Sequence, residues 1–254
     1  MYHDICEDAD ASGFAGADAA LYKISSAEFS SHLTAISTKV KEKLTLVTDW
    51  RNDANAVFIT FDDGGKSALD AAEMLENKGW RGHFFVTTGR IGTKNFVGKE
   101  EIIELHRRGH LIGSHSDSHP LRMASLSRRE IFEEWLISTE KLAEILGEKV
   151  TVASVPGGLY SKEAAECAAE NGIEFLFNSE PTTSVRQIGN CLVFGRYAVQ
   201  NWMKAPEVSA IAEGNLSPRL KQSLIWNAKK PLKKIGGETF LKIRKFLINQ
   251  KTGN

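Results

Sequence analysis

The chain of 254 residues lacks the cysteine patterns that build disulfide frameworks or thiolate metal sites. Its three cysteines, Cys6, Cys167 and Cys191, are odd in number, lie far apart and include no CxxC pair. Closely spaced cysteine pairs are the usual signature of a structural zinc site. The sequence therefore predicts free thiols, and it favours a reducing compartment, where disulfides are rare.

Long hydrophobic runs and a charge imbalance are also missing. No window approaches the ~18 apolar residues of a membrane-spanning helix, and residues 1–5 lack the basic and apolar stretches of a secretory signal. The formal net charge is zero and the pI is about 7.1, so we expect no nucleic-acid partner. These absences predict a cytoplasmic protein, either free or at the membrane face, although a chain shortened at its N-terminus would look the same.

The sequence does contain an ordinary globular composition, 42% hydrophobic and 25% charged residues, arranged as short apolar runs that alternate with amphipathic helical patterns. This alternation is typical of a parallel sheet that helices cover and that closes, or nearly closes, into a barrel. We expect strands at residues 2–5, 57–61, 83–86, 111–113, 150–155, 173–177 and 191–194. We expect helices at residues 25–40, 68–75, 99–108, 128–146 and 161–170. Ser25 and Glu28 form a capping-box pattern at the start of the first, and Ser161 is the predicted N-cap of the last.

The composition changes after about residue 204. We expect a barrel in residues 1–204 and a basic amphipathic extension in residues 205–254. Two interpretations of this extension stay open, a helix packed on the barrel with a solvated basic face, or peripheral contact with a membrane surface or an anionic glycan. Between residues 219 and 251 the acid Glu238 is outnumbered by Arg219, Lys221, Lys229, Lys230, Lys233, Lys234, Lys242, Arg244, Lys245 and Lys251.

Two adjacent acids, Asp62 and Asp63, follow the predicted strand at residues 57–61. Functional side chains of parallel α/β folds lie where the strands end. Neighbouring carboxylates in a turn point in different directions, so one can bind a metal while the other stays free as a base. An Asp-Asp-Gly turn alone is weak evidence, because aspartate is common in turns of every kind.

Two histidines, His115 and His119, follow another predicted strand at a spacing of four residues. On one face of a helical turn their nitrogens could converge on one ion at roughly 2.0–2.1 Å. With a carboxylate from another strand end they would form a set of three protein ligands with open positions. Such a set is typical of a catalytic rather than a structural metal site.

Here a resemblance to a known family becomes specific. Residues 60–64 (TFDDG) and 115–120 (HSDSHP) resemble the first two motifs of the polysaccharide deacetylase domain, also called the NodB-homology or carbohydrate esterase family 4 domain. The intervening segments FFV and GHLIG are similar as well, and the opening Tyr2-His3-Asp4 resembles exopolysaccharide-associated members. The resemblance spans roughly residues 1–200. Two motifs in the right order make a chance match rare.

The resemblance implies a distorted (β/α) barrel and a single domain that carries the basic helical C-terminal extension. It also implies that one divalent ion is bound by Asp63, His115 and His119, zinc first, with cobalt, manganese or nickel as alternatives. Asp62 would be the general base. Pro156 and the backbone N–H of Gly157 would contact the substrate and its oxyanion.

The later family motifs depart from the pattern. Ser154 stands where the family has an arginine that pairs with the base, and no histidine follows His119 to act as the general acid. We expect Arg196 to lie at the mouth of the site and to replace the missing cation, paired with either Asp62 or the developing oxyanion, with Tyr197 beside the substrate. Because guanidinium does not release its proton, His3, solvent or the protonated base would have to protonate the leaving amine.

The functional hypothesis is a metal-dependent hydrolase that removes N-acetyl groups from N-acetylhexosamine units of a polysaccharide or glycan precursor. Two other hypotheses stay open. One is a hydrolase of a non-sugar amide on the same scaffold. The other is a catalytically degenerate glycan-binding protein, which the missing arginine and histidine favour and the intact metal set disfavours.

Overall fold

The computed structural model describes residues 1–40, 44–53, 55–158 and 160–235, and for residues 229–235 it describes the backbone alone. A seven-stranded sheet with the order β3-β4-β5-β6-β7-β9-β8 forms the centre of the fold. All neighbouring strands pair in parallel except β8, which is antiparallel to β9. The strands are β3 (Thr60–Phe61), β4 (His83–Val86), β5 (Leu111–Ser114), β6 (Val152–Ser154), β7 (Phe175–Phe177), β8 (Arg186–Ile188) and β9 (Cys191–Phe194).

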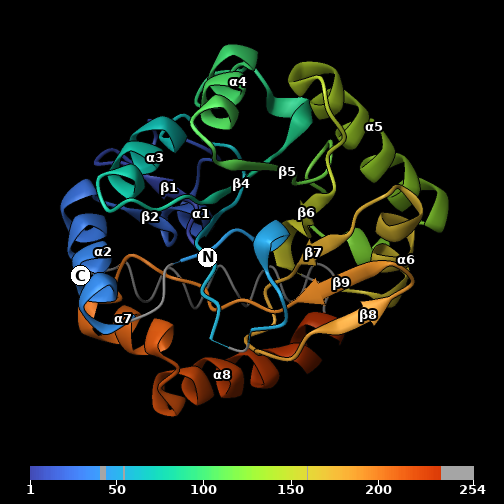
Figure 1. Cartoon of the computed structure of the whole chain (residues 1–254). Helices are drawn as coiled ribbons and strands as arrows, with labels where there is room; N and C mark the ends of the chain where they lie inside the picture. Colours follow the sequence, from blue (N-terminus) through green and yellow to red (C-terminus); the bar gives the residue numbers. More distant parts are fainter. Residues whose placement is uncertain (41–43, 54, 159, 236–254) are drawn as a thin grey trace.

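The sheet curls into an incomplete barrel, and helices surround it (Figure 1). A small parallel pair, β1 (Asp4–Ile5) and β2 (Lys23–Ile24), lies beside β3, where Tyr2 forms a bridge to Phe61. The predicted strand at residues 57–61 is shorter than expected. The carbonyl of Val57 accepts a hydrogen bond from Thr45 N instead of joining the sheet.

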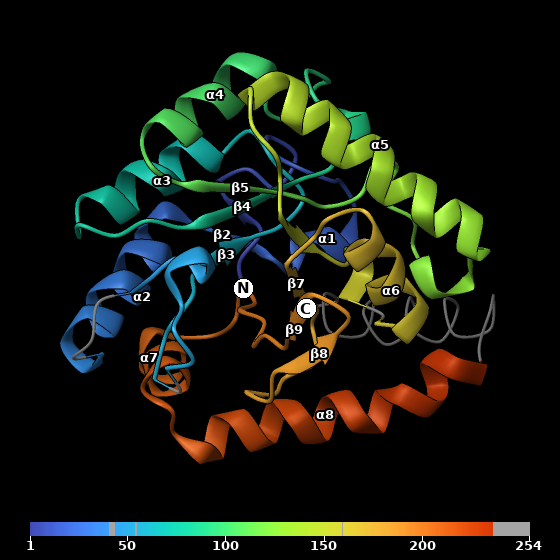
Figure 2. The ribbon, with the colours of Figure 1, turned by 45° about the vertical axis from the view of Figure 1, so that its right-hand side comes forward.

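The outer layer consists of α2 (Ser26–Lys39), α3 (Ala68–Glu76), α4 (Lys99–Arg107), α5 (Arg128–Leu146), α6 (Lys162–Glu170) and α7 (Ala205–Glu213), and the short α1 (Ala17–Ala20) lies after the first strand (Figure 2). The predicted N-caps of α2 and α6, Ser25 and Ser161, are confirmed. Ser25 accepts from Glu28 N at 3.2 Å, and Ser161 accepts from Ala164 N at 3.1 Å. Each bond satisfies a backbone donor that the first turn of a helix leaves free.

The sheet is buried on both faces. Successive residues of β4 show this, because Phe84 packs outward with the α2, α3 and α4 cluster while Phe85 packs inward with Phe177 and Phe194. Side chains of adjacent strand residues point to opposite faces, so a strand buried on both sides reads as a continuous apolar run. Phe85, Phe177 and Phe194 form an aromatic cluster inside the barrel. The predicted site residues lie beyond it, at the carboxyl ends of the strands.

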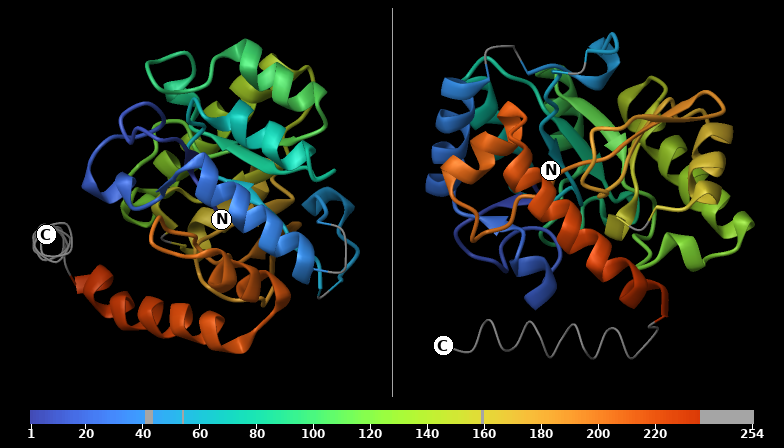
Figure 3. Two further views of the ribbon diagram at one scale, coloured as in Figure 1. Left: turned by 90° about the vertical axis from the view of Figure 1, so that its left-hand side faces the viewer. Right: turned by 90° about the horizontal axis from the view of Figure 1, so that it is seen from below.

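The C-terminal part begins with α7, whose Val208 and Ile211 join the same core cluster as α2. The long helix α8 (Leu216–Ile235) then runs along the edge of the molecule (Figures 2 and 3). The rest of the predicted extension, residues 236–254, lies outside the described residues. Among the helices that the structure describes, none is long and apolar enough to cross a bilayer.

Candidate metal centre and active site

The parallel sheet brings the predicted site residues to one end of the barrel. Asp62 and Asp63 follow β3, His115 follows β5, and Arg196 follows β9. These strands run in the same direction, so their carboxyl ends lie at the same edge. Residues far apart in the chain meet there, as the 134 positions between Asp62 and Arg196 show.

Asp63, His115 and His119 converge as the sequence predicted. The Nε2 atoms of His115 and His119 each lie 3.3 Å from Oδ1 of Asp63. One ligand atom from each residue falls within 4.8 Å of the other two. His115 Nδ1 is 2.9 Å from the Ser154 carbonyl, which fixes the ring and leaves Nε2 for a ligand. Two imidazole nitrogens and one carboxylate oxygen suit a zinc-like divalent ion.

The histidine segment is a loop, so the expected helical turn is wrong. Ser116 and His119 have left-handed backbones, with φ values of 61° and 58°. Side chains hold this conformation: Ser116 Oγ accepts from His119 N at 3.2 Å, and Ser114 Oγ accepts from Ser116 N at 3.1 Å. Local bonds of this kind compete with helical ones. The two imidazoles thus converge through a folded loop rather than through helical periodicity.

A residue that the sequence did not single out supports this loop. Glu134 of α5 accepts hydrogen bonds from Asp117 N at 3.0 Å and from Ser118 N at 2.9 Å. Its other oxygen accepts from Ser118 Oγ at 2.5 Å. Asp117 in turn accepts from Thr88 Oγ1 at 2.7 Å. No sequence signal marked Glu134, because charged residues on the exposed side of a helix are common.

The backbone at the first motif is strained. Asp63 has a φ of 77°, a conformation that costs a residue with a side chain on the order of 1–3 kcal/mol. Gly64 follows with a φ of 78°, and a Cβ there would lie 3.2 Å from the backbone of Val86. Thr87 N and Val97 N bind the carbonyls of Asp63 and Gly64 and hold the turn. The strain aims the Asp63 carboxylate at the two histidines.

Asp62 and Arg196 form a bidentate ion pair in the interior. Arg196 Nη1 lies 2.7 Å from Oδ1, and Nη2 lies 2.8 Å from Oδ2. The two residues are 4% and 6% exposed. The guanidinium also donates to Ser154 Oγ at 2.6 Å and to Thr60 Oγ1 at 3.0 Å. Arg196 therefore makes the contact to Asp62, one of the two partners expected of it, but from a buried position rather than from the mouth of the site.

The ion pair sets the charge state of Asp62. Burial by itself would raise the pKa of this carboxyl, but Arg196 and then His115 outweigh burial and lower the pKa to about 2. The pKa of Asp63 is likewise lowered, because hydrogen bonds from His115 and His119 exceed the effect of burial. For His115 burial acts to lower the pKa, and the two aspartates raise it overall. Both carboxylates are ionised at neutral pH.

His3 lies near this cluster. Its Nδ1 is buried and has no hydrogen-bond partner within the described part of the chain. The ring lies against Tyr22, with centroids 4.5 Å apart. Burial lowers the pKa of His3, and the nearby Asp63 and Asp62 oppose this shift.

The three residues predicted to contact the substrate or its oxyanion lie outside the cluster of aspartates and histidines. Pro156 and Gly157 follow β6, and a Cβ on Gly157 would lie 3.1 Å from the Leu121 carbonyl beyond the histidine loop. The ring of Tyr197 packs against the core under the Arg219 guanidinium, at 5.1 Å. The substrate roles of Pro156, Gly157 and Tyr197 stay predictions.

Phe14 is a second residue that the sequence analysis missed. Its half-buried ring lies 4.6 Å from the ring of His119, and it contacts Phe96 edge-on at 5.0 Å. The segment around Phe14 is rich in glycine and alanine, so periodicity gave no signal. Phe14 restricts the position of the His119 ring from the side of the N-terminal loop.

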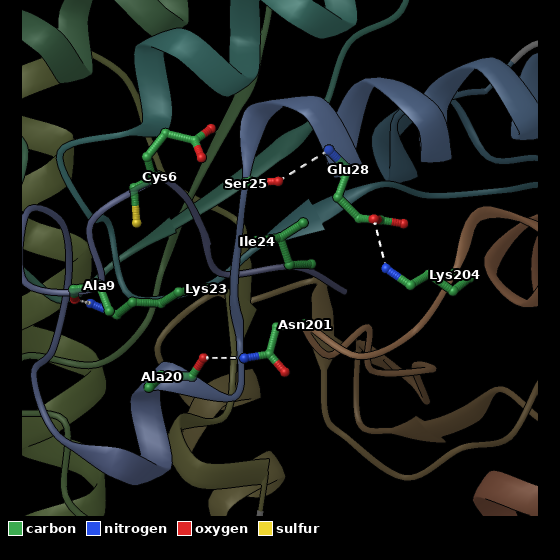
Figure 4. Close-up of a pocket in the computed structure, with 10 residues that line it drawn as sticks. Cys6, Ala9, Ala20, Lys23, Ile24, Ser25, Glu28, Asn201 and Lys204 are labelled. Atoms are coloured by element: carbon green, nitrogen blue, oxygen red, sulfur yellow. Dashed lines mark hydrogen bonds and ion pairs between the residues drawn. The ribbon is translucent and has the colours of Figure 1, made fainter. Parts of the chain in front are cut away.

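A hollow of about 440 Å³ lies elsewhere, among β2, the start of α2 and the segment before α7 (Figure 4). Its polar groups bind one another. Lys204 pairs with Glu28 at 3.0 Å, and Asn201 donates to the Ala20 carbonyl at 2.9 Å. The lining includes none of the metal-site residues. The hollow is therefore separate from the candidate centre.

Comparison with known families now identifies the scaffold. The family model described as polysaccharide deacetylase matches residues 50–176, half of the chain. The chain belongs to the polysaccharide deacetylase family. The resemblance seen in the two motifs is thereby confirmed.

Two relatives share part of the sequence. "Putative polysaccharide deacetylase YxkH" of Bacillus subtilis (strain 168) is 27% identical over 178 residues, which cover 70% of this chain and 61% of that protein. An uncharacterised 30.6 kDa protein of Geobacillus stearothermophilus is 27% identical over 124 residues, 48% of this chain and 45% of that protein. The chain thus matches less than two thirds of the length of either relative.

Solved structures of deacetylases share the fold. IcaB from Ammonifex degensii superposes with a TM-score of 0.65 at 22% identity, covering 84% of this chain and 97% of that one. A polysaccharide deacetylase from Bacillus cereus gives 0.69 at 17% identity, covering 84% and 67%. The Streptococcus pyogenes deacetylase PplD, in complex with acetate, gives 0.63 at 17% identity, covering 72% and 85%. These matches confirm the predicted distorted α/β barrel.

Proposed function

We propose that the protein is a metal-dependent N-deacetylase that acts on N-acetylhexosamine units of a polysaccharide or glycan precursor. The observation that carries the proposal is the convergence of Asp63, His115 and His119 beside the buried Asp62–Arg196 pair. On a barrel of the polysaccharide deacetylase family, these residues could provide a metal-ligand set next to a second carboxylate, that of Asp62. A carbohydrate substrate is the expectation that the family supports.

Asp63, His115 and His119 are the residues that would hold the ion, and their donor atoms fit zinc first, with cobalt, manganese or nickel as alternatives. When bound, a divalent ion supplies Lewis acidity, which lowers the pKa of a coordinated water and polarises the amide carbonyl. The protein contributes orientation. The Ser154 carbonyl fixes His115, and the Glu134-supported loop fixes His119.

Asp62 is the proposed base. With a pKa of about 2 it is ionised at any physiological pH and can accept a proton from the attacking water. Its proton affinity is low, so the proton must pass on rapidly to the leaving nitrogen or to solvent. Arg196 holds both carboxylate oxygens in place and balances their charge, as a guanidinium fork does well.

Bond cleavage needs an oxyanion donor and an acid. The backbone N–H of Gly157, after β6, is the proposed donor to the tetrahedral oxyanion, and Pro156 is proposed to contact the sugar. When the carbon–nitrogen bond breaks, acetate leaves and the amine must gain a proton. His3, whose buried Nδ1 lies near both aspartates, is proposed to pass to that amine the proton that Asp62 takes from the water.

The proposal is tested by the metal content of the purified protein, together with acetate release from N-acetylglucosamine oligomers. We expect about one divalent ion per chain and acetate release that a chelator abolishes. The double variant Asp63→Ala/His119→Ala should lose both the ion and the activity. The conservative variant His106→Gln, on the distant helix α4, is the control and should retain both.

The outcomes separate the alternatives. Failure of the wild type to bind any divalent ion, even after reloading, would overturn the metal-dependent mechanism. Stoichiometric metal without acetate release from glycans would direct attention to non-sugar amides. Glycan binding with no hydrolysis of either substrate class would identify a degenerate glycan-binding protein.

A further inference from the structure

Helix α8 exposes a stripe of leucines to solvent. Leu216, Leu220 and Leu224 are 70%, 56% and 70% exposed. Their spacing of four residues places them in one row along the helix. Two more large apolar residues, Ile225 at 44% and Trp202 at 50%, are exposed on and beside this helix. We call these five residues the α8 apolar face.

The opposite side of α8 is fastened to the barrel. Arg219 donates to the Ile211 carbonyl at 3.0 Å and covers the Tyr197 ring. Gln222 donates to the Ala198 carbonyl at 3.0 Å, and Ser223 donates to the Pro181 carbonyl at 2.6 Å. Rotation of the helix to bury the leucines would break these bonds. The apolar face is therefore the outward side of a fixed helix, at the edge of the molecule (Figure 3).

The charge of α8 indicates what covers this face. Between Leu216 and Ile235 the helix contains six basic residues and no acid. Lys221, 58% exposed, lies 3.5 Å from Glu207 of α7 and extends over the ring of Trp202 at 5.7 Å. A second copy of this helix would bring like charges together. Residues 236–254, which add four basic residues and one acid, lie outside the described residues.

We propose that α8 docks the protein on the surface of a membrane that contains anionic lipids, with the leucine stripe at the headgroup boundary. Basic residues attract such a surface, and leucine and tryptophan enter its outer layer. A soluble anionic glycan would satisfy the lysines but would leave three exposed leucines without an apolar partner. The proposal concerns attachment and does not depend on the proposed hydrolysis.

The test is co-sedimentation of the full chain with vesicles, either pure phosphatidylcholine or an equal mixture of phosphatidylcholine and phosphatidylglycerol. We expect binding to the mixed vesicles alone, weakened by salt. The triple variant Leu216→Ser/Leu220→Ser/Leu224→Ser should bind at least about tenfold more weakly. The matched control Ile103→Ser/Ile137→Ser changes exposed apolar residues of α4 and α5 and should bind like the wild type.

Three results would overturn the proposal. One is undiminished binding by the triple variant. A second is equal binding to both kinds of vesicle. The third is a wild-type dimer in light scattering that the triple variant abolishes, because the face would then join two copies. Circular dichroism and thermal unfolding establish that the variants fold. Since the replaced leucines are exposed, we expect unfolding temperatures close to that of the wild type.

Discussion

At the scale of single residues, the main departure from the family pattern is the position of an arginine. Ser154, at the end of β6, stands where the sequence resemblance led us to expect an arginine, and Arg196 reaches Asp62 from the end of β9. Ser154 contacts two residues of the site: its hydroxyl accepts a hydrogen bond from Arg196, and its carbonyl contacts His115. The charge on Asp62, the proposed base, is thus balanced by Arg196 at the end of β9 rather than by a residue of β6.

Replacement of Arg196 by lysine should impair the base. One ammonium cannot contact both oxygens of Asp62, so we expect kcat/KM to fall by about 10²-fold. The pH profile should change too. Asp62 works above its pKa, and without the fork its burial acts to raise that pKa from about 2. The acidic limb of the profile should therefore move to higher pH.

The matched control is Arg186→Lys. Arg186 pairs with Glu180 at 2.8 Å, but its side chain is 47% exposed and lies on the edge strand β8. We expect its pH–rate profile to match the wild type. An unchanged acidic limb in Arg196→Lys would contradict the assignment of Arg196 as the group that keeps Asp62 ionised.

At the scale of elements, the candidate metal ligands are positioned by segments that carry none of them. Helix α5 supplies Glu134 to the histidine loop, and the N-terminal loop supplies Phe14 to His119. Contacts from two sides thus add to the loop's own hydrogen bonds in supporting its left-handed conformations. The conformation of the histidine loop therefore depends on α5 as well as on the sequence of residues 115–120.

Glu134→Ala should weaken metal binding without unfolding the protein. The variant removes the acceptor for two loop N–H groups, and losing such outer partners typically lowers metal affinity about 10- to 100-fold. Isothermal titration with zinc measures the effect. Its neighbour Glu133 pairs only with Arg129 on the exposed face among the contacts described, so Glu133→Ala is the control. Equal zinc affinities for the two variants would show that the histidine loop keeps its conformation without the hydrogen bonds to Glu134.

At the scale of the whole molecule, the candidate centre joins distant parts of the barrel. Asp63 comes from the end of β3 and the histidines from beyond β5, with β4 between them in the sheet. An ion held by all three would bind the folded chain and not the unfolded one. Metal binding should therefore stabilise the fold as a whole.

Chelation should lower the unfolding temperature. If zinc is present at about 1,000 times its dissociation constant, its removal costs about 4 kcal/mol of stability. For a chain of this size that corresponds to about 10 °C. Differential scanning calorimetry with and without a chelator measures the change. The double variant Asp63→Ala/His119→Ala should show no response, and a response equal to that of the wild type would place the stabilising ion elsewhere.

The sequence by itself determined the local features and the identity of the scaffold. The N-caps at Ser25 and Ser161, the bounds of α5 and the strand runs could be predicted because they depend on neighbours within a few residues. Asp62, Asp63, His115 and His119 could be predicted because two motifs in the right order are rare by chance.

Only the tertiary structure decided how these pieces meet. The Asp62–Arg196 pair was an expectation until strands 134 residues apart were placed at one edge. The loop form of residues 115–120, the support from Glu134 and the contact of Phe14 had no sequence signal, because each depends on packing between distant segments. The exposed leucines of α8 belong here too. Periodicity finds an apolar stripe, but it cannot tell whether that stripe faces the barrel or the solvent.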